Sequence, residues 1–188
     1  MYIVIEGIDT AGKSTQLDIL KQNNPTAIFT KEPGGTKIGL ELREMALSGQ
    51  AKSSLAEMFI FLADRAEHIY EIIVPNQDKI IISDRSLISG IAYAKNFSID
   101  KMIELNKLAT NNILPSHIVI LKLTKDELIK RLSLKKNDSI ESRGIEYLLD
   151  IQSRLIETVV KMDLNHIIID ANESIEDISM KIGEFLNK

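Results

Sequence analysis

The feature that most limits the possible folds of this chain is a glycine-containing turn between an apolar run and a segment with helical spacing. Tyr2-Ile3-Val4-Ile5 has the composition of a buried strand, and residues 7–14 follow it with the pattern G-x-x-x-x-G-K-S. Apolar spacing predicts a helix over residues 13–23. A strand, a glycine turn and a helix in this order are typical of α/β domains with a parallel sheet.

Four more short runs are almost continuously apolar, at residues 27–30, 80–83, 118–121 and 167–169. Helical spacing occupies residues 38–48, 55–74, 86–95, 100–111, 125–134, 145–162 and 174–186. Parallel strands that are covered by helices on both faces have this composition. The alternation predicts a three-layer α/β/α fold with a five-stranded parallel sheet, in one domain over residues 1–188. In such folds ligands bind beyond the carboxyl ends of the strands.

Composition excludes several classes of function. The chain has no cysteine, which excludes thiol catalysis and disulfides and fits a cytoplasmic protein. Its 23 Lys and Arg against 27 Asp and Glu argue against a general nucleic-acid binder. No apolar run approaches the roughly 20 residues that span a bilayer, and the N-terminus lacks the pattern of a signal peptide. We therefore expect a cytoplasmic protein without nucleic-acid or membrane partners.

The glycine turn also has the composition of a phosphate-binding loop. Its glycines allow backbone N–H groups to converge on one anion, and the following helix adds its dipole. Lys13 would bridge the β- and γ-phosphates of ATP, and Ser14 would place its hydroxyl on Mg²⁺. The residues expected around the ATP phosphates are Gly7, Ile8, Asp9, Thr10, Ala11, Gly12, Lys13, Ser14 and Thr15.

A second candidate lies where the run at residues 80–83 ends. Asp84 occupies the position at which a carboxylate faces the Mg²⁺ shell, directly or through water. Arg85 beside it can donate two parallel hydrogen bonds to phosphate oxygens. The alternative is an Asp–Arg surface pair, which would stabilise the fold little. The phosphate loop favours the functional interpretation.

Residues 133–144 are polar and charged between two predicted helices. The segment is either a solvated connection or a mobile lid that carries cations.

Several motifs in a fixed order make the chain resemble the thymidylate kinase family of P-loop nucleoside monophosphate kinases over nearly its whole length. These motifs are Glu6-Gly7-Ile8-Asp9, Gly12-Lys13-Ser14-Thr15-Gln16, Lys31-Glu32-Pro33-Gly34-Gly35-Thr36, Phe61-Leu62-Ala63-Asp64-Arg65-Ala66-Glu67-His68, Ser83-Asp84-Arg85-Ser86, Ala92-Tyr93 and Asp170-Ala171-Asn172-Glu173-Ser174-Ile175-Glu176. The resemblance implies Mg²⁺-dependent transfer of the γ-phosphoryl group of ATP to dTMP, giving dTDP and ADP for dTTP synthesis. It also implies a homodimer, although apolar residues on several helix faces are equally typical of buried core helices.

The resemblance implies roles for the acceptor-binding residues. Asp9 would accept a hydrogen bond from the 3′-hydroxyl of dTMP, and Phe61 would stack on thymine. Arg65, one helical turn from Phe61, would reach a base carbonyl. Arg85 would hold the acceptor phosphate. Tyr93 would contact the edge of the sugar and disfavour a 2′-hydroxyl group. Pro33 would form a turn near the acceptor and Ser89 would contribute to base recognition. Arg43 is either an extra cation near the acceptor phosphate or a solvated helix residue, and the second interpretation is favoured.

On the donor side, the resemblance implies that Arg131 lies against adenine and that Ala171 and Asn172 face its other side. Some relatives carry an arginine inside the phosphate loop, where this chain has Thr10. The transition-state cation would then come from the lid, as Lys135, Lys136 or Arg143. The expected catalytic set is Asp9, Lys13, Arg85 and Arg143. Gly90 stands where relatives often carry a polar side chain that touches the base.

Three rival functions are consistent with a phosphate loop: a P-loop kinase with another acceptor, a GTP-dependent switch, and a nucleotide-binding protein without catalysis. A GTP switch would carry an Asn-Lys-x-Asp motif that binds guanine, after a later strand. This chain has Lys122-Leu123-Thr124-Lys125-Asp126 there. The sequence therefore favours a kinase.

Overall fold

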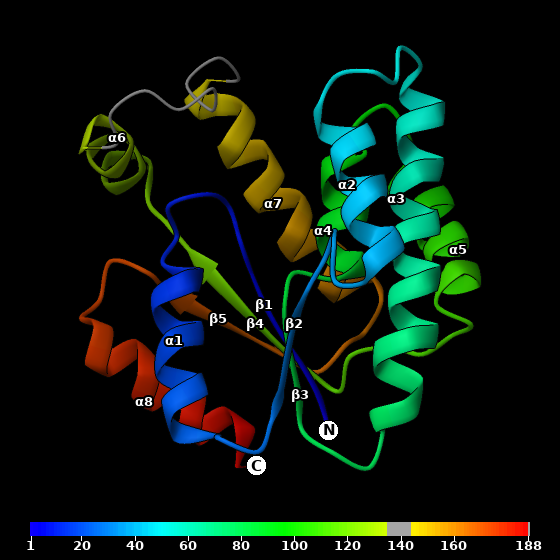
Figure 1. Cartoon of the computed structure of the whole chain (residues 1–188). Coiled ribbons are helices and arrows are strands. Elements are labelled where there is room, and N and C mark those ends of the chain that lie inside the picture. Colours follow the sequence, from blue (N-terminus) through cyan, green and yellow to red (C-terminus); the bar gives the residue numbers. More distant parts are fainter. Residues whose placement is uncertain (135–143, 188) are drawn as a thin grey trace.

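The computed structural model describes residues 1–134 and 144–187. Its centre is a parallel sheet of five strands in the order β2-β3-β1-β4-β5 (Figure 1). The strands are β1 (Tyr2–Gly7), β2 (Ile28–Lys31), β3 (Ile81–Asp84), β4 (His117–Lys122) and β5 (His166–Asp170). The predicted five-stranded parallel sheet and its α/β class are confirmed.

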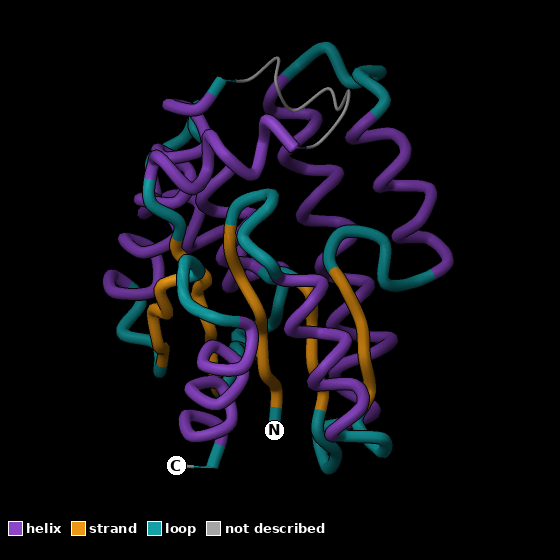
Figure 2. Tube along the Cα trace, turned by 90° about the vertical axis from the view of Figure 1, so that its left-hand side faces the viewer, coloured by secondary structure: helices purple, strands orange, loops and turns teal. Residues whose placement is uncertain are grey.

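Helices cover both faces of the sheet, and Figure 2 shows the strands running side by side among them. They are α1 (Lys13–Asn23), α2 (Lys37–Leu47), α3 (Ser54–His68), α4 (Leu87–Tyr93), α5 (Ile99–Ala109), α6 (Lys125–Leu134), α7 (Ile145–Lys161) and α8 (Ile175–Leu186). Helices α1 and α8 contact each other and the sheet, while α4 and α7 pack together and contact β1. Helix α3 contacts α2, α4 and α5, so these helices extend the layer that contains α4.

The strand register places the chemistry-bearing loops at one edge of the sheet. Asp84 at the end of β3 lies opposite both Ile5 of β1 and Lys31 of β2, and Gly7 lies opposite Leu121 of β4. Side chains on the central strands, such as Val4, are fully buried between the helix layers. The loops that follow β1, β2 and β3 therefore begin beside one another.

The predicted helix over residues 55–74 is only partly α-helical. Helix α3 ends at His68 and continues as a π-helical turn, Ile69–Ile73, and a 3-10 turn, Val74–Asn76. Pro75 has no N–H to donate to an α-helical hydrogen bond, and its ring crowds the carbonyl four residues earlier. The α-helical pattern is thus lost in the turn before the proline. No helix in the described ranges is long and apolar enough to cross a membrane.

Candidate active site

The phosphate loop connects β1 to α1 through a backbone that requires its two glycines. Gly7 has φ +152°, and a Cβ there would lie 2.9 Å from the carbonyl oxygen of Leu121. Gly12 has φ +96° and caps α1 without a side-chain hydrogen bond to the helix. The first N–H groups of α1 are thus not covered by a capping side chain. A helix start of this kind binds anions because its dipole and its amides point outward.

Lys13 is buried and folds back over the loop. Its Nζ donates hydrogen bonds to the carbonyl oxygens of Gly7 at 3.0 Å and Ile8 at 3.2 Å. Burial, followed by the positive charge of Arg85, lowers the pKa of Lys13 to about 8, against the opposing effect of nearby carboxylates. The ammonium group is thus held among weak acceptors that a phosphate oxygen would replace.

Asp84 and Ser14 are the two residues expected beside Mg²⁺. Oδ1 of Asp84 is buried and has no hydrogen-bond partner among the described residues, and the Ser14 side chain is exposed at the start of α1. A buried carboxylate oxygen without a partner fits a cation or its water. Within the described ranges no three His, Asp or Glu side chains form a metal cluster, so a metal here would also need phosphate oxygens.

Arg85 connects the phosphate loop to α4. Its Nη2 donates to Oδ1 of Asp9 at 2.9 Å, and its Nη1 donates to Oγ of Ser89 at 3.0 Å. The guanidinium carbon lies 5.3 Å from the ring centre of Tyr93. Arg85 has φ +70°, a strained conformation for a residue with a side chain. These contacts bring four of the predicted residues together.

Glu6 completes this network from beneath and was not predicted as a site residue. Its fully buried carboxylate accepts hydrogen bonds from Oγ of Ser86 at 2.9 Å, from N of Ser89 at 3.2 Å and from Oγ of Ser89 at 2.5 Å. Burial raises its pKa, although Arg85 and the serine contacts lower it in part. Glu6 was part of a quoted motif, yet its role beneath Ser86 and Ser89 needed the structure.

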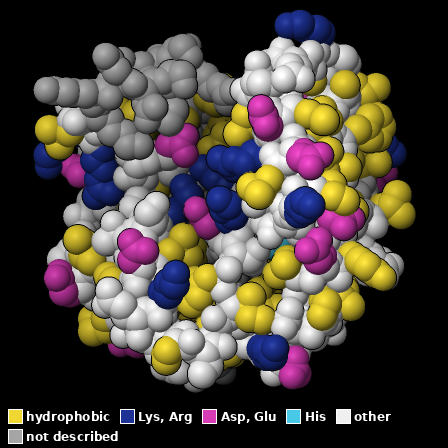
Figure 3. All heavy atoms as spheres, viewed as in Figure 1, with side chains coloured by type: hydrophobic (Ala, Val, Ile, Leu, Met, Phe, Trp, Pro, Cys, Tyr) yellow, Lys and Arg dark blue, Asp and Glu magenta, His cyan; other side chains and the backbone are white. Residues whose placement is uncertain are grey.

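A cavity of about 650 Å³ opens beside Asp9 and Arg85, a size typical of small-molecule sites. All seven residues that were predicted to bind the acceptor line it, namely Asp9, Pro33, Phe61, Arg65, Arg85, Ser89 and Tyr93. Arg43 also lines it and donates to the carbonyl oxygen of Pro33 at 3.1 Å, so it is not simply a solvated helix residue. Figure 3 shows basic side chains gathered in a hollow in the middle of one face of the molecule.

In the wall of this cavity, Glu32 holds Arg65, and it also holds His68. Its Oε2 accepts from Nε of Arg65 at 2.8 Å, and its Oε1 lies 2.8 Å from Nδ1 of His68. Burial raises the pKa of Glu32, but Arg65 and His68 outweigh that effect and the pKa lies below its usual value. Nε2 of His68 lies 2.7 Å from Oγ1 of Thr30. Glu32 was part of a quoted motif, yet its role as an anchor for Arg65 needed the structure.

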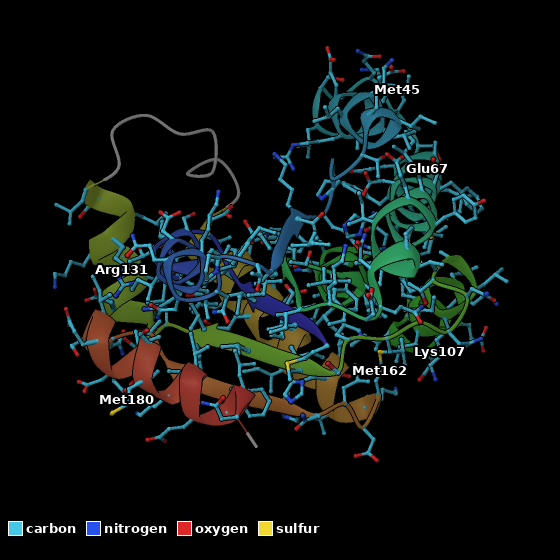
Figure 4. All side chains as sticks on the ribbon, turned by 60° about the horizontal axis from the view of Figure 1, so that its bottom comes forward. Met45, Glu67, Lys107, Arg131, Met162 and Met180 are labelled. Atoms are coloured by element: carbon cyan, nitrogen blue, oxygen red, sulfur yellow. The ribbon has the colours of Figure 1, made fainter. Side chains whose placement is uncertain are left out.

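On the donor side, Arg131 joins the phosphate loop to the turn after β5. It donates from Nη1 to the carbonyl oxygen of Thr10 at 3.1 Å and from Nη2 to that of Ala171 at 2.6 Å, while Glu127 accepts from its Nε. Figure 4 shows Arg131 on α6, on the side of α1. Arg131 and Ala171 line a cavity of about 180 Å³ beside the start of α1, and Asn172 is exposed next to it.

The predicted lid is mostly outside the described residues. Helix α6 ends at Leu134, and α7 begins at Ile145 after its cap residue Gly144. The three candidate cations of the lid, Lys135, Lys136 and Arg143, all lie outside the described ranges.

Sequence and structure comparisons both indicate one protein family. A model of the thymidylate kinase family matches residues 5–182. The chain is 65% identical to the thymidylate kinase of Aliarcobacter butzleri, over 100% of this chain and 99% of that protein, and 52% identical to that of Wolinella succinogenes, over 97% and 96%. The crystal structure of thymidylate kinase from Ehrlichia chaffeensis superposes with a TM-score of 0.78 at 26% identity, covering 100% of this chain and 98% of that one. The chain therefore belongs to the thymidylate kinase family.

Proposed function

We propose that this chain transfers the γ-phosphoryl group of ATP to dTMP, giving ADP and dTDP, with Mg²⁺ as cofactor. One observation carries the proposal beyond family membership. The cavity that all seven expected acceptor residues line includes Asp9 in its wall, and Asp9 belongs to the loop whose Lys13 is expected on the donor phosphates. An acceptor in that cavity would lie directly beside the donor.

Each residue contributes to positioning and charge, which dominate catalysis of phosphoryl transfer. Arg85 would hold the phosphate of dTMP, and Asp9 would accept a hydrogen bond from its 3′-hydroxyl. A phosphate oxygen of dTMP then attacks the γ-phosphorus, and the bond to the β–γ bridging oxygen breaks with its electrons leaving on ADP. Lys13 and the first amides of α1 would stabilise the negative charge that moves onto the β-phosphate.

Ser14 and Asp84 would hold Mg²⁺ together with phosphate oxygens. When bound, the ion would neutralise charge on the β- and γ-phosphates. Oδ1 of Asp84, which has no hydrogen-bond partner among the described residues, supports this assignment.

We also place the protein in the cytoplasm, consistent with its lack of cysteine, and propose that it forms a homodimer. Large apolar side chains are about half exposed along α2 and α3, namely Ile38, Leu40, Met45, Leu55 and Phe59. Met45 is labelled on α2 in Figure 4. Sedimentation is expected to give twice the chain mass of 21.1 kDa, and a monomer at micromolar concentration would contradict the dimer.

The test of the activity is a panel of acceptors supplied with ATP and Mg²⁺, with ADP release as the readout. We expect dTMP to be the best acceptor among dTMP, dUMP, dCMP, dAMP and thymidine. Preference for thymidine would indicate a nucleoside kinase, and preference for another monophosphate would indicate a different acceptor. Hydrolysis of GTP in preference to ATP, without any acceptor, would favour a GTP switch.

A further inference from the structure

We propose that Gly90 and Asn106 determine acceptor-base specificity by fixing the guanidinium group of Arg65, an inference that rests on the proposed function. Gly90 lies on α4 and Asn106 on α5, and both contact the side chain of Arg65, which lies on α3. Neither residue is expected to touch the nucleotide phosphates. Both would act through the position of Arg65.

Arg65 is buried and held by three acceptors from three parts of the chain. Its Nε donates to Oε2 of Glu32 at 2.8 Å, its Nη1 to Oδ1 of Asn106 at 2.5 Å, and its Nη2 to the carbonyl oxygen of Ser86 at 3.2 Å. A guanidinium group has five N–H donors in a rigid plane, so these bonds fix its orientation and use three donors. Arg65 also lines the acceptor cavity, where one of its other N–H groups can meet a base.

Gly90 is what allows the guanidinium to occupy this position. A Cβ at residue 90 would lie 2.6 Å from Nη1, 2.7 Å from Nη2 and 2.9 Å from Cζ of Arg65. All three distances are shorter than real side-chain contacts, so any larger residue would displace the guanidinium. Because the crowded atoms belong to the Arg65 side chain and not to backbone, relief of the clash displaces the guanidinium from its hydrogen-bond acceptors.

Asn106 presents its oxygen, and not its amide nitrogen, to Arg65. The side chain is fully buried, and its Nδ2 donates to the carbonyl oxygen of Met102 at 2.7 Å, one helical turn back. This bond fixes the orientation of the amide group, so that Oδ1 faces Nη1 of Arg65. The oxygen thus holds Nη1 without adding a second negative charge beside Glu32.

A guanidinium fixed in this way selects one class of acceptor base. Arg65 can only donate, so it pairs with a ring carbonyl and not with an amino group. All three pyrimidines have a carbonyl at ring position 2, so the proposal places Arg65 at ring position 4, where thymine and uracil have a carbonyl and cytosine has an amino group. A site with an oriented donor therefore rejects cytosine more strongly than a site with a displaced one. The combination of Gly90 and Asn106 predicts selection of 4-oxo pyrimidine monophosphates.

The test compares Gly90→Ala with Gly183→Ala, which makes the same change on α8. Apart from α8 itself, no atom of the described residues lies within 4 Å of a Cβ added at Gly183. Gly90→Ala is expected to raise KM for dTMP about 10- to 100-fold and to lower the dTMP-to-dCMP ratio of kcat/KM at least about tenfold. KM for ATP is expected to stay within about twofold, since the donor site is untouched. Gly183→Ala should match the wild type in all three quantities.

Asn106 is tested with Asn106→Leu, which removes the acceptor, and Asn106→Asp, which keeps it. Asn106→Leu is expected to reproduce the loss of dTMP selectivity, and Asn106→Asp to retain most of it. A purely structural role would lower Tm in both variants and leave the dTMP-to-dCMP ratio unchanged. That result, or a Gly90→Ala enzyme with wild-type selectivity, would overturn the inference. A wild-type enzyme without activity on dTMP would instead refute the proposed function, and it is measured first.

Discussion

Nη2 of Arg85 lies 2.9 Å from Oδ1 of Asp9, which joins the end of β3 to the middle of the phosphate loop. These two residues are 76 positions apart in the chain and lie in the loops that follow the neighbouring parallel strands β1 and β3. The ion pair lies at the boundary between the donor loop and the acceptor cavity. An acceptor phosphate held by Arg85 would thus lie next to the site where the γ-phosphate is expected.

Asp9 should matter for the acceptor far more than for ATP. Asp9→Ala removes a partner of Arg85 and the expected acceptor for the 3′-hydroxyl. A hydrogen bond to a charged group contributes about 1.5–3 kcal/mol, so kcat/KM for dTMP should fall about 10- to 150-fold. Asp18→Ala, at an exposed position of α1, is the matched control. Steady-state kinetics measure KM for both substrates. An equal rise in KM for ATP and for dTMP would contradict the assignment.

The pH dependence of ATP use should reflect Lys13. Its pKa of about 8 means that the charged form is lost as the pH rises above that value in the free enzyme. Since kcat/KM reports the free enzyme, kcat/KM for ATP should fall above about pH 8. Bound phosphates favour the charged amine, so kcat should decline only at higher pH. Lys13→Ala should abolish turnover, and a flat kcat/KM profile up to pH 10 would disprove this role for Lys13.

Phe61 is expected to bind the thymine ring by stacking. Phe61→Ala should raise KM for dTMP by about 5- to 150-fold, which corresponds to roughly 1–3 kcal/mol for a base on an aromatic ring. KM for ATP should not change. Tyr70→Ala, which truncates an exposed aromatic residue just after α3, controls for loss of aromatic surface. The stacking role is wrong if ATP affinity falls as much as dTMP affinity.

Asp84→Asn should increase the requirement for Mg²⁺. The neutral amide binds the ion or its water less well, so the Mg²⁺ concentration for half-maximal activity should rise roughly 10- to 100-fold. Asp78→Asn, in the exposed turn before β3, should leave it unchanged. A titration of activity with MgCl₂ at fixed ATP measures both. An unchanged Mg²⁺ requirement in Asp84→Asn would remove this residue from the metal site.

The strands and the phosphate loop could be predicted from the sequence because their signals are local. Continuous apolar runs marked the buried strands, and the spacing of Gly7, Gly12 and Lys13 marked the loop. The shared face of Phe61 and Arg65 followed from helical periodicity, and both side chains line the cavity.

The supporting contacts could not be predicted because they join distant positions. Asn106 is 41 residues from Arg65, and Glu6 is 83 residues from Ser89. Buried Asn and Glu have no sequence pattern that names their partners, which depend on how helices pack onto the sheet. The π-helical turn after His68 was also missed, because the apolar spacing of residues 69–73 continues that of α3.

The central claim is that the phosphoryl group passes from ATP directly to dTMP beside Asp9 and Lys13. It is tested most directly by ³¹P NMR of the wild-type enzyme with ATP, Mg²⁺ and dTMP. We expect ADP and dTDP to appear in equal amounts, with no free phosphate and no reaction in Lys13→Ala. ADP that appears together with inorganic phosphate, or ATP that is consumed without formation of dTDP, would contradict it.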